Sequence, residues 1–275
     1  MKPQGGSAAG RIVLIGSGEI GPSMAPLHRA LVASLPARRT PASLVALDGS
    51  YDFQTNRAEM GEKIAEFFRT KVGVATTVVG LPETERAGAD LAPSAFSSTL
   101  AALDAANLLF LGPGSPSRAI FRWSGTPIVD RLVARIRAGA TLVTSSAAAA
   151  ASGEATIPVY EIYKVGEEPR WLDGLDLLGP HGLRVAVIPH YDNAEGGNHD
   201  TRFCYLGEER LLRLEAELPL SQRLSDLETL QSKRLGIDDA SGALDSSLAV
   251  LVLSSSSDES VLEAATAAAG ATPEL

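Results

Sequence analysis

The sequence contains one cysteine, Cys204, among 275 residues. A single cysteine excludes an internal disulfide and any zinc site built from several cysteines. Aromatic residues are also scarce, at 5% of the chain, whereas alanine is abundant. We therefore expect a core built mainly from Val, Leu, Ile and Ala.

Long apolar runs and an excess of positive charge are lacking too. No apolar run approaches the ~20 residues that a membrane-spanning helix needs. The first residues, MKPQGGSAAG, have no apolar core of a signal peptide. The net charge is −9 without a basic stripe, which disfavours nucleic-acid binding because phosphate contacts need clustered Lys and Arg. These absences predict a cytoplasmic protein with neither a nucleic-acid nor a membrane partner.

Short apolar runs alternate with amphipathic segments along most of the chain. Such continuous apolar strands, alternating with helices, predict a three-layer α/β fold with a mostly parallel sheet and helices on both faces. We expect strands at 11–15, 43–47, 72–79, 107–111 and 140–144, and helices at 22–35, 56–71, 93–106 and 117–138, the last broken near Gly125.

The second half of the chain has weaker patterns. Further strands are expected at 157–163, 183–188, 234–237 and 247–253, the last as an added edge strand. We expect one α/β domain over residues 11–253, a flexible leader over 1–10, and a polar, Ala-rich tail over 254–275.

Three turns of small residues follow predicted strands, where α/β folds place their ligands. The first, GSGEIG (16–21), matches the G-x-G-x-x-G dinucleotide fingerprint and would suit a nucleotide-dependent oxidoreductase. However, the acidic residue expected about 20 positions later is missing, and Pro22 follows the third glycine. A tight turn between strand and helix explains the glycines equally well. The second turn is GPGS (112–115).

The third turn, TSSAAAAASGE (144–154), suits a nucleophile elbow. An elbow places a serine on a sharp turn from strand to helix, and its neighbours two before and two after must be small. For Ser146 these neighbours are Thr144 and Ala148, and the fit is worse for Ser145. Backbone N–H groups of Ala147 and of the GPGS turn could bind an oxyanion. Alternatively, Ser146 only caps a helix.

A nucleophilic serine needs a base, and His190 stands just past a predicted strand on the same side of the sheet. A third group should orient that base, and the candidates are Glu161, in PVYEIYKVG, and Asp192. A metal site is an alternative, although no His-x-x-x-His pair is present, and a solvated loop is another. The ligands of such a metal ion would come from His190, Asp192, His199 and Asp200.

Five segments together resemble the serine peptidase family that holds cyanophycinase and α-aspartyl dipeptidase, within the class I glutamine amidotransferase-like (flavodoxin-like) fold. They are LIGSGE, LFLGPGS, GATLVTSSAAA, IPHYDNAEGGNHDTR and LGIDD, and the resemblance spans roughly residues 11–253.

The resemblance implies Ser146 as nucleophile, His190 as base and Glu161 as acid, with oxyanion-hole amides from Gly114 and Ala147. Arg202, after Thr201, would meet a substrate carboxylate. The remaining substrate-binding positions would be Ser115, Asp192 and Asn193.

The implied activity is hydrolysis of a peptide or isopeptide bond in a small substrate, without metal or organic cofactor. The chain departs from the family pattern at Ala148, where glycine is preferred, and in GPGS, which lacks the family's Asn or Asp. These departures motivate an alternative, an inactive relative that binds a small ligand. A homodimer is left open.

Overall fold

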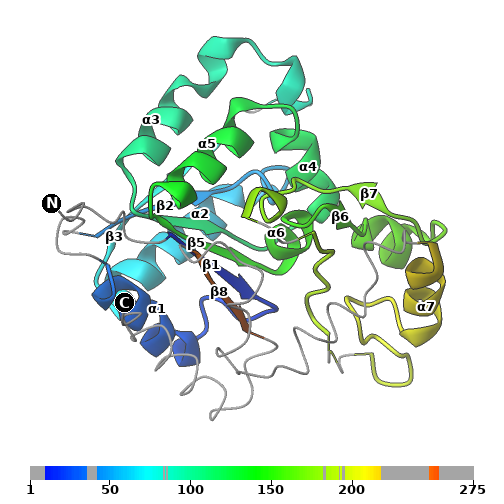
Figure 1. Cartoon of the computed structure of the whole chain (residues 1–275). Coiled ribbons are helices and arrows are strands. Elements are labelled where there is room, and N and C mark those ends of the chain that lie inside the picture. The colour runs from blue at the N-terminus through cyan, green and yellow to red at the C-terminus, as the bar shows by residue number, and fades with distance from the viewer. Residues whose placement is uncertain are drawn as a thin grey trace, which may run out of the picture.

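The computed structural model describes residues 10–35, 42–82, 84, 86–181, 184–191, 193, 196–217 and 248–253. Its centre is a six-stranded sheet in the order β3-β2-β4-β5-β1-β8, and every neighbouring pair is parallel (Figure 1). The predicted parallel α/β sheet is confirmed. The strands are β1 (Gly10–Ile15), β2 (Ser43–Leu47), β3 (Ala75–Val79), β4 (Leu108–Leu111), β5 (Thr141–Ser145) and β8 (Leu248–Leu253).

Helices cover both faces of this sheet, as predicted (Figure 1). One face packs against α1 (Ala25–Ala33) and α2 (Arg57–Phe67). The other packs against α3 (Ser97–Ala105), α4 (Pro116–Trp123), α5 (Pro127–Arg137) and α6 (Ser146–Ala151). Short turns complete this part: η1 (Pro22–Met24), η3 (Phe68–Val72), η4 (Gly88–Asp90), η5 (Pro93–Phe96) and η7 (Gly179–His181).

The central strand β4 is apolar throughout because both of its faces are buried. In β4, Leu109 and Leu111 point into the core under α3–α6, whereas Leu108 and Phe110 point into the core under α1 and α2. This alternation follows from the two-residue period of a strand. The sheet is thereby fixed from both sides, so the positions where its strands end are fixed as well.

Beyond the sheet, a smaller unit contributes several residues of the candidate active site. It contains β6 (Ala155–Thr156) and β7 (Leu172–Asp173), which pair antiparallel, η6 (Glu161–Val165) and α7 (Glu208–Glu217). A third apolar cluster holds it together, and Ile162, Ile188, Phe203 and Leu214 belong to it.

Two strand predictions in this unit were wrong. The segment 157–163 is helical where it enters η6, because Val159 and Ile162, three apart, are buried while Tyr160 is exposed. Residues 184–188 make only an isolated bridge, between Ala186 and Ala155. The edge strand predicted at 247–253 is confirmed as β8, beside β1. The strand predicted at 234–237, most of the leader and the tail lie outside the described residues.

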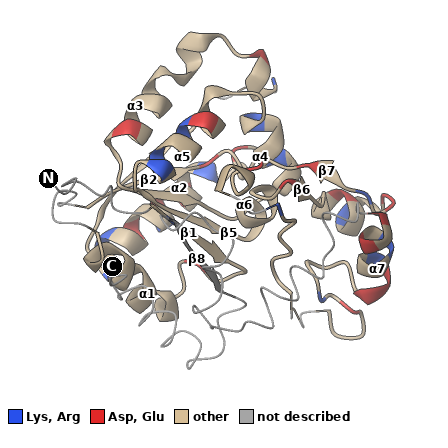
Figure 2. Cartoon of the chain, viewed as in Figure 1, with Lys and Arg blue, Asp and Glu red and all other residues tan. Residues whose placement is uncertain are grey.

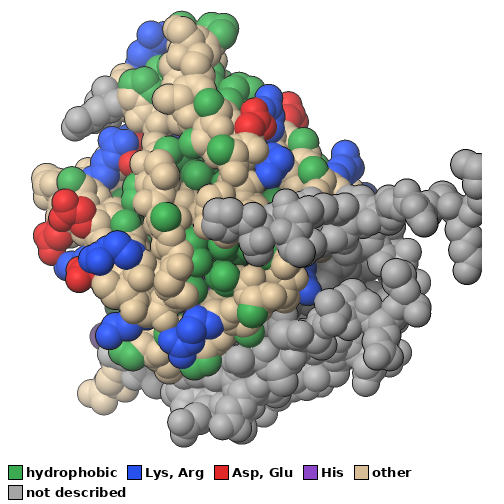
Figure 3. All heavy atoms as spheres, turned by 90° about the vertical axis from the view of Figure 1, so that its left-hand side faces the viewer, with side chains coloured by type: hydrophobic (Ala, Val, Ile, Leu, Met, Phe, Trp, Pro, Cys, Tyr) green, Lys and Arg blue, Asp and Glu red, His purple; other side chains and the backbone are tan. Residues whose placement is uncertain are grey.

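Charged side chains lie mainly on the helices, and α7 carries both signs (Figure 2). On the face drawn in Figure 3, Lys and Arg alternate with Asp and Glu and do not gather into a stripe of one sign. Within the described ranges, no helix combines the length and the apolar character needed to cross a bilayer.

A buried ion cluster fixes α4, whose N-terminus borders the site. Asp52 accepts from Arg118 Nε and pairs with Arg122 Nε, both at 2.6 Å. The Arg122 side chain is fully buried, and its other nitrogens donate to the carbonyls of Arg86 and Pro82 at 2.8 Å. Arg122 therefore joins three segments that are distant in sequence.

We predict that Arg122→Met lowers the free energy of unfolding by about 3 kcal/mol, because two carbonyls and part of the Asp52 charge stay buried without a donor. Urea unfolding measures the loss. Arg131→Met, which breaks an exposed pair with Asp104, is the matched control and should cost less than about 1 kcal/mol. Equal losses for the two variants would contradict the role given to Arg122.

Candidate active site

Three of the parallel strands end side by side. Ile15 of β1 is in register with Ser145 of β5, and Leu111 of β4 is in register with Thr144. The turns that follow these strands therefore meet at one edge of the sheet. This is the edge where parallel α/β folds place their ligands.

Ser146 lies directly after β5, at the first position of α6, with φ of +48°. A non-glycine residue in this left-handed region is uncommon and costs about 1–2 kcal/mol. Five buried alanines follow, Ala147–Ala151. Their small side chains let α6 pack tightly after the turn. A serine of positive φ therefore stands on a sharp turn from strand to helix, the backbone arrangement that the predicted elbow requires.

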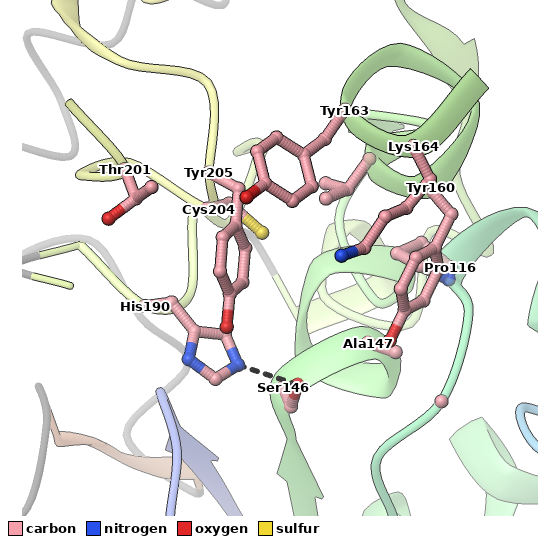
Figure 4. A pocket seen from close by; sticks show the side chains of 12 residues that line it. Pro116, Ser146, Ala147, Tyr160, Tyr163, Lys164, His190, Thr201, Cys204 and Tyr205 are labelled. Carbon is pink, nitrogen blue, oxygen red and sulfur yellow. Dashed lines mark hydrogen bonds between the residues drawn. The ribbon is translucent and has the colours of Figure 1, made fainter. Parts of the chain in front are cut away.

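His190 faces this serine across the pocket, and its Nε2 lies 2.9 Å from Ser146 Oγ (Figure 4). When the imidazole carries its proton on Nδ1, Nε2 accepts the hydroxyl proton. His190 itself has φ of +49°. The two predicted partners, 44 residues apart in sequence, are therefore brought together at the expected edge.

A left-handed turn holds the backbone of His190 in place. Phe203, Cys204 and Tyr205 have φ of +58°, +58° and +65°. The N–H of Phe203 donates to Tyr191 O at 2.9 Å, and the N–H of Cys204 donates to His190 O at 3.2 Å. Three successive non-glycine residues in this conformation are expensive. They are held by the apolar cluster to which Phe203 and Cys204 belong.

A pocket of about 350 Å³ opens beside the Ser146–His190 pair. Figure 4 shows side chains from η6 on one side and from the 201–205 segment on the other, with Ser146 at the base. The lining residues are Gly114, Pro116, Ser146, Ala147, Val159, Tyr160, Tyr163, Lys164, His190, Thr201, Cys204 and Tyr205.

The side chains that line the pocket include an ammonium group, phenol hydroxyls and a thiol. Lys164 supplies the one ammonium group among the residues just named, and its Nζ lies 4.7 Å from the centroid of the Tyr163 ring. Tyr160 is 42% exposed, and the partial burial of its side chain raises the pKa of its hydroxyl, which stays neutral and able to donate. Burial also raises the pKa of the Cys204 thiol to about 12. A thiol in this state is a poor nucleophile, since the thiolate is the reactive form.

The GSGEIG turn follows β1, the neighbour of β5 in the sheet, and none of its residues lines this pocket. Glu19 is buried, which raises its pKa, and the nearby Ser145 hydroxyl partly offsets the effect. Its carbonyl accepts from His28 Nε2 at 2.7 Å. Burial lowers the pKa of His28 to about 4, so the ring is neutral and keeps this donor.

Glu161 and Ser115 are placed differently from their predicted roles. The structure does not bring Glu161 to His190: its Oε1 accepts from Ser117 Oγ at 2.5 Å, and its buried Oε2 has no hydrogen-bond partner among the described residues. Ser115 is buried, and its Oγ caps α4 by accepting from Arg118 N at 3.2 Å. Gly114 and Ala147, the predicted oxyanion-hole residues, both line the pocket.

The predicted substrate-binding residues after His190 do not lie together in the pocket. Thr201 lines the pocket, and its Oγ1 accepts from Gly196 N at 3.0 Å. Arg202 does not line it and binds Asp200 at 2.9 Å and Glu208 at 3.0 Å, which raises the pKa of Arg202 and lowers that of Asp200. Asn193, outside the lining, offers its carbonyl to Thr201 Oγ1 at 3.4 Å. Asp192 lies outside the described residues.

The metal alternative gains no support from the described ranges. No group of three or more His, Cys, Asp or Glu side chains there is arranged to hold a metal ion. Two of the four candidate ligands, His199 and Asp200, are exposed, and Asp200 is engaged by Arg202.

Sequence reasoning missed the pocket wall formed by Tyr160, Tyr163 and Lys164. These residues stand at i, i+3 and i+4, which places them on one face of a helical turn. The interpretation of PVYEIYKVG as a strand hid this spacing. The break at Pro158 and the left-handed Gly166 (φ of +85°), which ends η6, were the available signals.

Comparison with known proteins shows that a solved structure has a similar fold. No protein-family model and no curated protein matches the sequence. The solved structure of a peptidase from an acI-B1 Actinobacterium is similar, with a TM-score of 0.57 and 19% identity, over 76% of this chain and 78% of that one. At this identity the likeness shows the fold alone.

A second solved structure comes from Listeria monocytogenes EGD-e, a protein provisionally named Peptidase E. It matches at 15% identity over 66% of this chain and 80% of that one, and its TM-score of 0.45 is too low to support an argument.

We predict that Ser146→Gly is more stable than Ser146→Ala by about 1 kcal/mol, because glycine tolerates a φ of +48° and alanine does not. Both variants lose the hydrogen bond to His190, so the difference between their stabilities reports the cost of the left-handed backbone at this position. Urea unfolding of the two variants measures it. An alanine variant as stable as the glycine variant would show that the elbow is unstrained.

Proposed function

We propose that this protein is a serine hydrolase that cleaves a peptide or isopeptide bond in a small substrate. The observation that carries the proposal is the 2.9 Å contact between Ser146 Oγ and His190 Nε2 at the base of a pocket. A nucleophile within hydrogen-bond reach of a base is the arrangement that acyl transfer requires. The strained backbone of Ser146 adds support, since left-handed residues outside glycine cluster at functional sites.

The first half of the reaction forms an acyl-enzyme. Ser146 Oγ attacks the substrate carbonyl while His190 Nε2 takes the hydroxyl proton. The carbonyl oxygen becomes an oxyanion, and the backbone N–H groups of Ala147 and Gly114 stabilise it. His190 then gives its proton to the departing amine, and the acyl group remains as an ester on Ser146 Oγ.

The second half releases the product acid. A water molecule loses a proton to His190 as its oxygen attacks the ester carbonyl, and the same backbone amides stabilise the second oxyanion. Collapse of this intermediate breaks the bond to Ser146 Oγ, and His190 returns the proton to that oxygen. All proton transfers in this scheme pass between His190, Ser146, water and the substrate, and the backbone amides only stabilise the oxyanions.

Gly114 is suited to its part because a side chain cannot be accommodated there. Its φ is +139°, and an added Cβ would lie 2.1 Å from the carbonyl oxygen of Ser50. The N–H of the next residue, Ser115, donates to that same oxygen at 2.8 Å. The turn is thus held against the Ser50 backbone with its glycine at the pocket surface. The shared fold with a protein described as a peptidase is consistent with this assignment.

The pocket favours a substrate that bears a carboxylate. Lys164 is the fixed positive charge of its lining, and no described carboxylate forms an ion pair with it. Arg202, the residue expected to meet a carboxylate, is already bound by Asp200 and Glu208. We assign the recognition of substrate charge to Lys164. A hydrogen bond to a charged group contributes about 1.5–3 kcal/mol.

The direct test is peptide hydrolysis by purified protein, followed by chromatography of a dipeptide and tripeptide panel that includes acidic residues. Ser146→Ala should lower the rate by at least about 10³-fold, because the nucleophile is removed. Ser145→Ala, the neighbouring serine, is the matched control and should retain turnover. Hydrolysis that survives in Ser146→Ala would refute the assignment. A wild-type protein that binds these peptides without cleaving them would identify a binding protein instead.

To test the preference for a carboxylate, we predict that Lys164→Met raises KM for a carboxylate-bearing peptide about 10- to 100-fold. The KM of the amide analogue of that peptide should stay nearly unchanged. Comparing Asp with Asn side chains, and free with amidated C-termini, identifies which carboxylate is recognised. Arg202→Met is the matched control and should leave both KM values unchanged. A larger effect in Arg202→Met than in Lys164→Met would contradict the assignment.

A further inference from the structure

Glu161 begins η6, the segment that brings Tyr163 and Lys164 to the pocket. Its carboxylate leaves the pocket side and contacts α4, where Ser117 Oγ donates to Oε1 at 2.5 Å. Ser117 Oγ in turn lies 2.9 Å from Ser115 Oγ. The three side chains therefore form one chain of hydrogen bonds from η6 to the first turn of α4.

The direction of this chain follows from counting protons. An ionised carboxylate only accepts hydrogen bonds, so Ser117 must donate its single hydroxyl proton to Glu161. Ser117 can then only accept from Ser115, and Ser115 donates to it. One lone pair of Ser115 Oγ accepts the N–H of Arg118 at 3.2 Å. The proton of each hydroxyl in the chain is committed, and the bond from Ser117 Oγ to Glu161 Oε1 fixes the direction of the chain.

The chain joins two walls of the pocket. Ser115 lies between Gly114 and Pro116, which both line the pocket from the α4 side. Tyr163 and Lys164 line it from η6. A shift of η6 relative to α4 would therefore change the distance between the residue that recognises substrate and the glycine that faces the oxyanion. Such displacements lower the rate of reactions that depend on alignment.

The geometry points to Glu161 as a positioning residue that ties η6 to the Gly114 turn through Ser117 and Ser115, and not as the group that orients His190. This inference rests on the proposed hydrolase function for its kinetic consequences. Its structural content, which side chain Glu161 acts on, holds in an inactive protein as well.

The first experiment is therefore independent of turnover. The imidazole of His190 is titrated by NMR in the wild type and in Glu161→Gln. Loss of a directly bonded carboxylate would lower the midpoint by about 1 pH unit or more. We expect a change of less than about 0.3 pH units, because Glu161 Oε1 binds Ser117, and its Oε2 makes no hydrogen bond to His190 or to any other described residue. A change of about 1 unit or more would overturn the inference.

The second experiment compares kcat/KM in Glu161→Gln, Glu161→Ala, Ser117→Ala and the double variant Ser117→Ala with Glu161→Ala. The glutamine variant keeps an acceptor for Ser117 and should stay within about 3-fold of the wild type. Each alanine variant should lose roughly 10-fold, about the effect of one hydrogen bond to a charged group. The double variant should lose no more than the worse single variant, because one chain is broken in each case.

The kinetic outcomes distinguish the two possible roles. A loss of about 10⁴-fold in Glu161→Gln, with Ser117→Ala unaffected, is the signature of an acid that orients a catalytic histidine and would overturn the inference. Additive losses in the double variant would also overturn it. If the wild type has no activity, the proposed function fails, while the His190 titration and a double-variant cycle on melting temperature still decide the role of Glu161.

Discussion

The site depends on one hydrogen bond, between Ser146 and His190, that links two segments with unfavourable backbones. Both residues have positive φ, and so do Cys204 and Tyr205, which line the same pocket. Each such residue costs about 1–2 kcal/mol, and the rest of the fold must offset this cost. The sheet does so for Ser146, and the apolar cluster below the 203–205 turn does so for His190.

The sheet supports the turn at Ser146 because the register of its strands is fixed from both sides. A strand that slipped by one residue would exchange its two buried faces, which pack against different helices. The ends of β1, β4 and β5 are therefore held side by side. Asp52 binds Arg118, in the first turn of α4, and Arg122, near the end of that helix, and so holds α4 against this edge. The position of Gly114 relative to Ser146 follows from these two constraints.

Much of the fold could be predicted from the sequence because its signals are local. The predicted strand at 43–47 coincides with β2. The proximity of Ser146 and His190 could be expected because each follows an apolar run that ends at the same edge of the sheet. Glu161 and Arg202 were harder to place because their partners are decided by tertiary contacts with Ser117 and by a turn that presents Asp200 and Glu208. The left-handed turn at 203–205 had no sequence signal, since Phe, Cys and Tyr do not favour it.

The measurement that tests the central claim most directly is labelling with a fluorophosphonate probe, followed by mass spectrometry of the digested protein. The probe reacts only with a serine that a base has activated. We expect one adduct, on Ser146, and a rate that falls at least about 100-fold in His190→Gln, because general-base catalysis is lost. No adduct, or an adduct on another serine, would contradict the account and leave the pocket as a binding site.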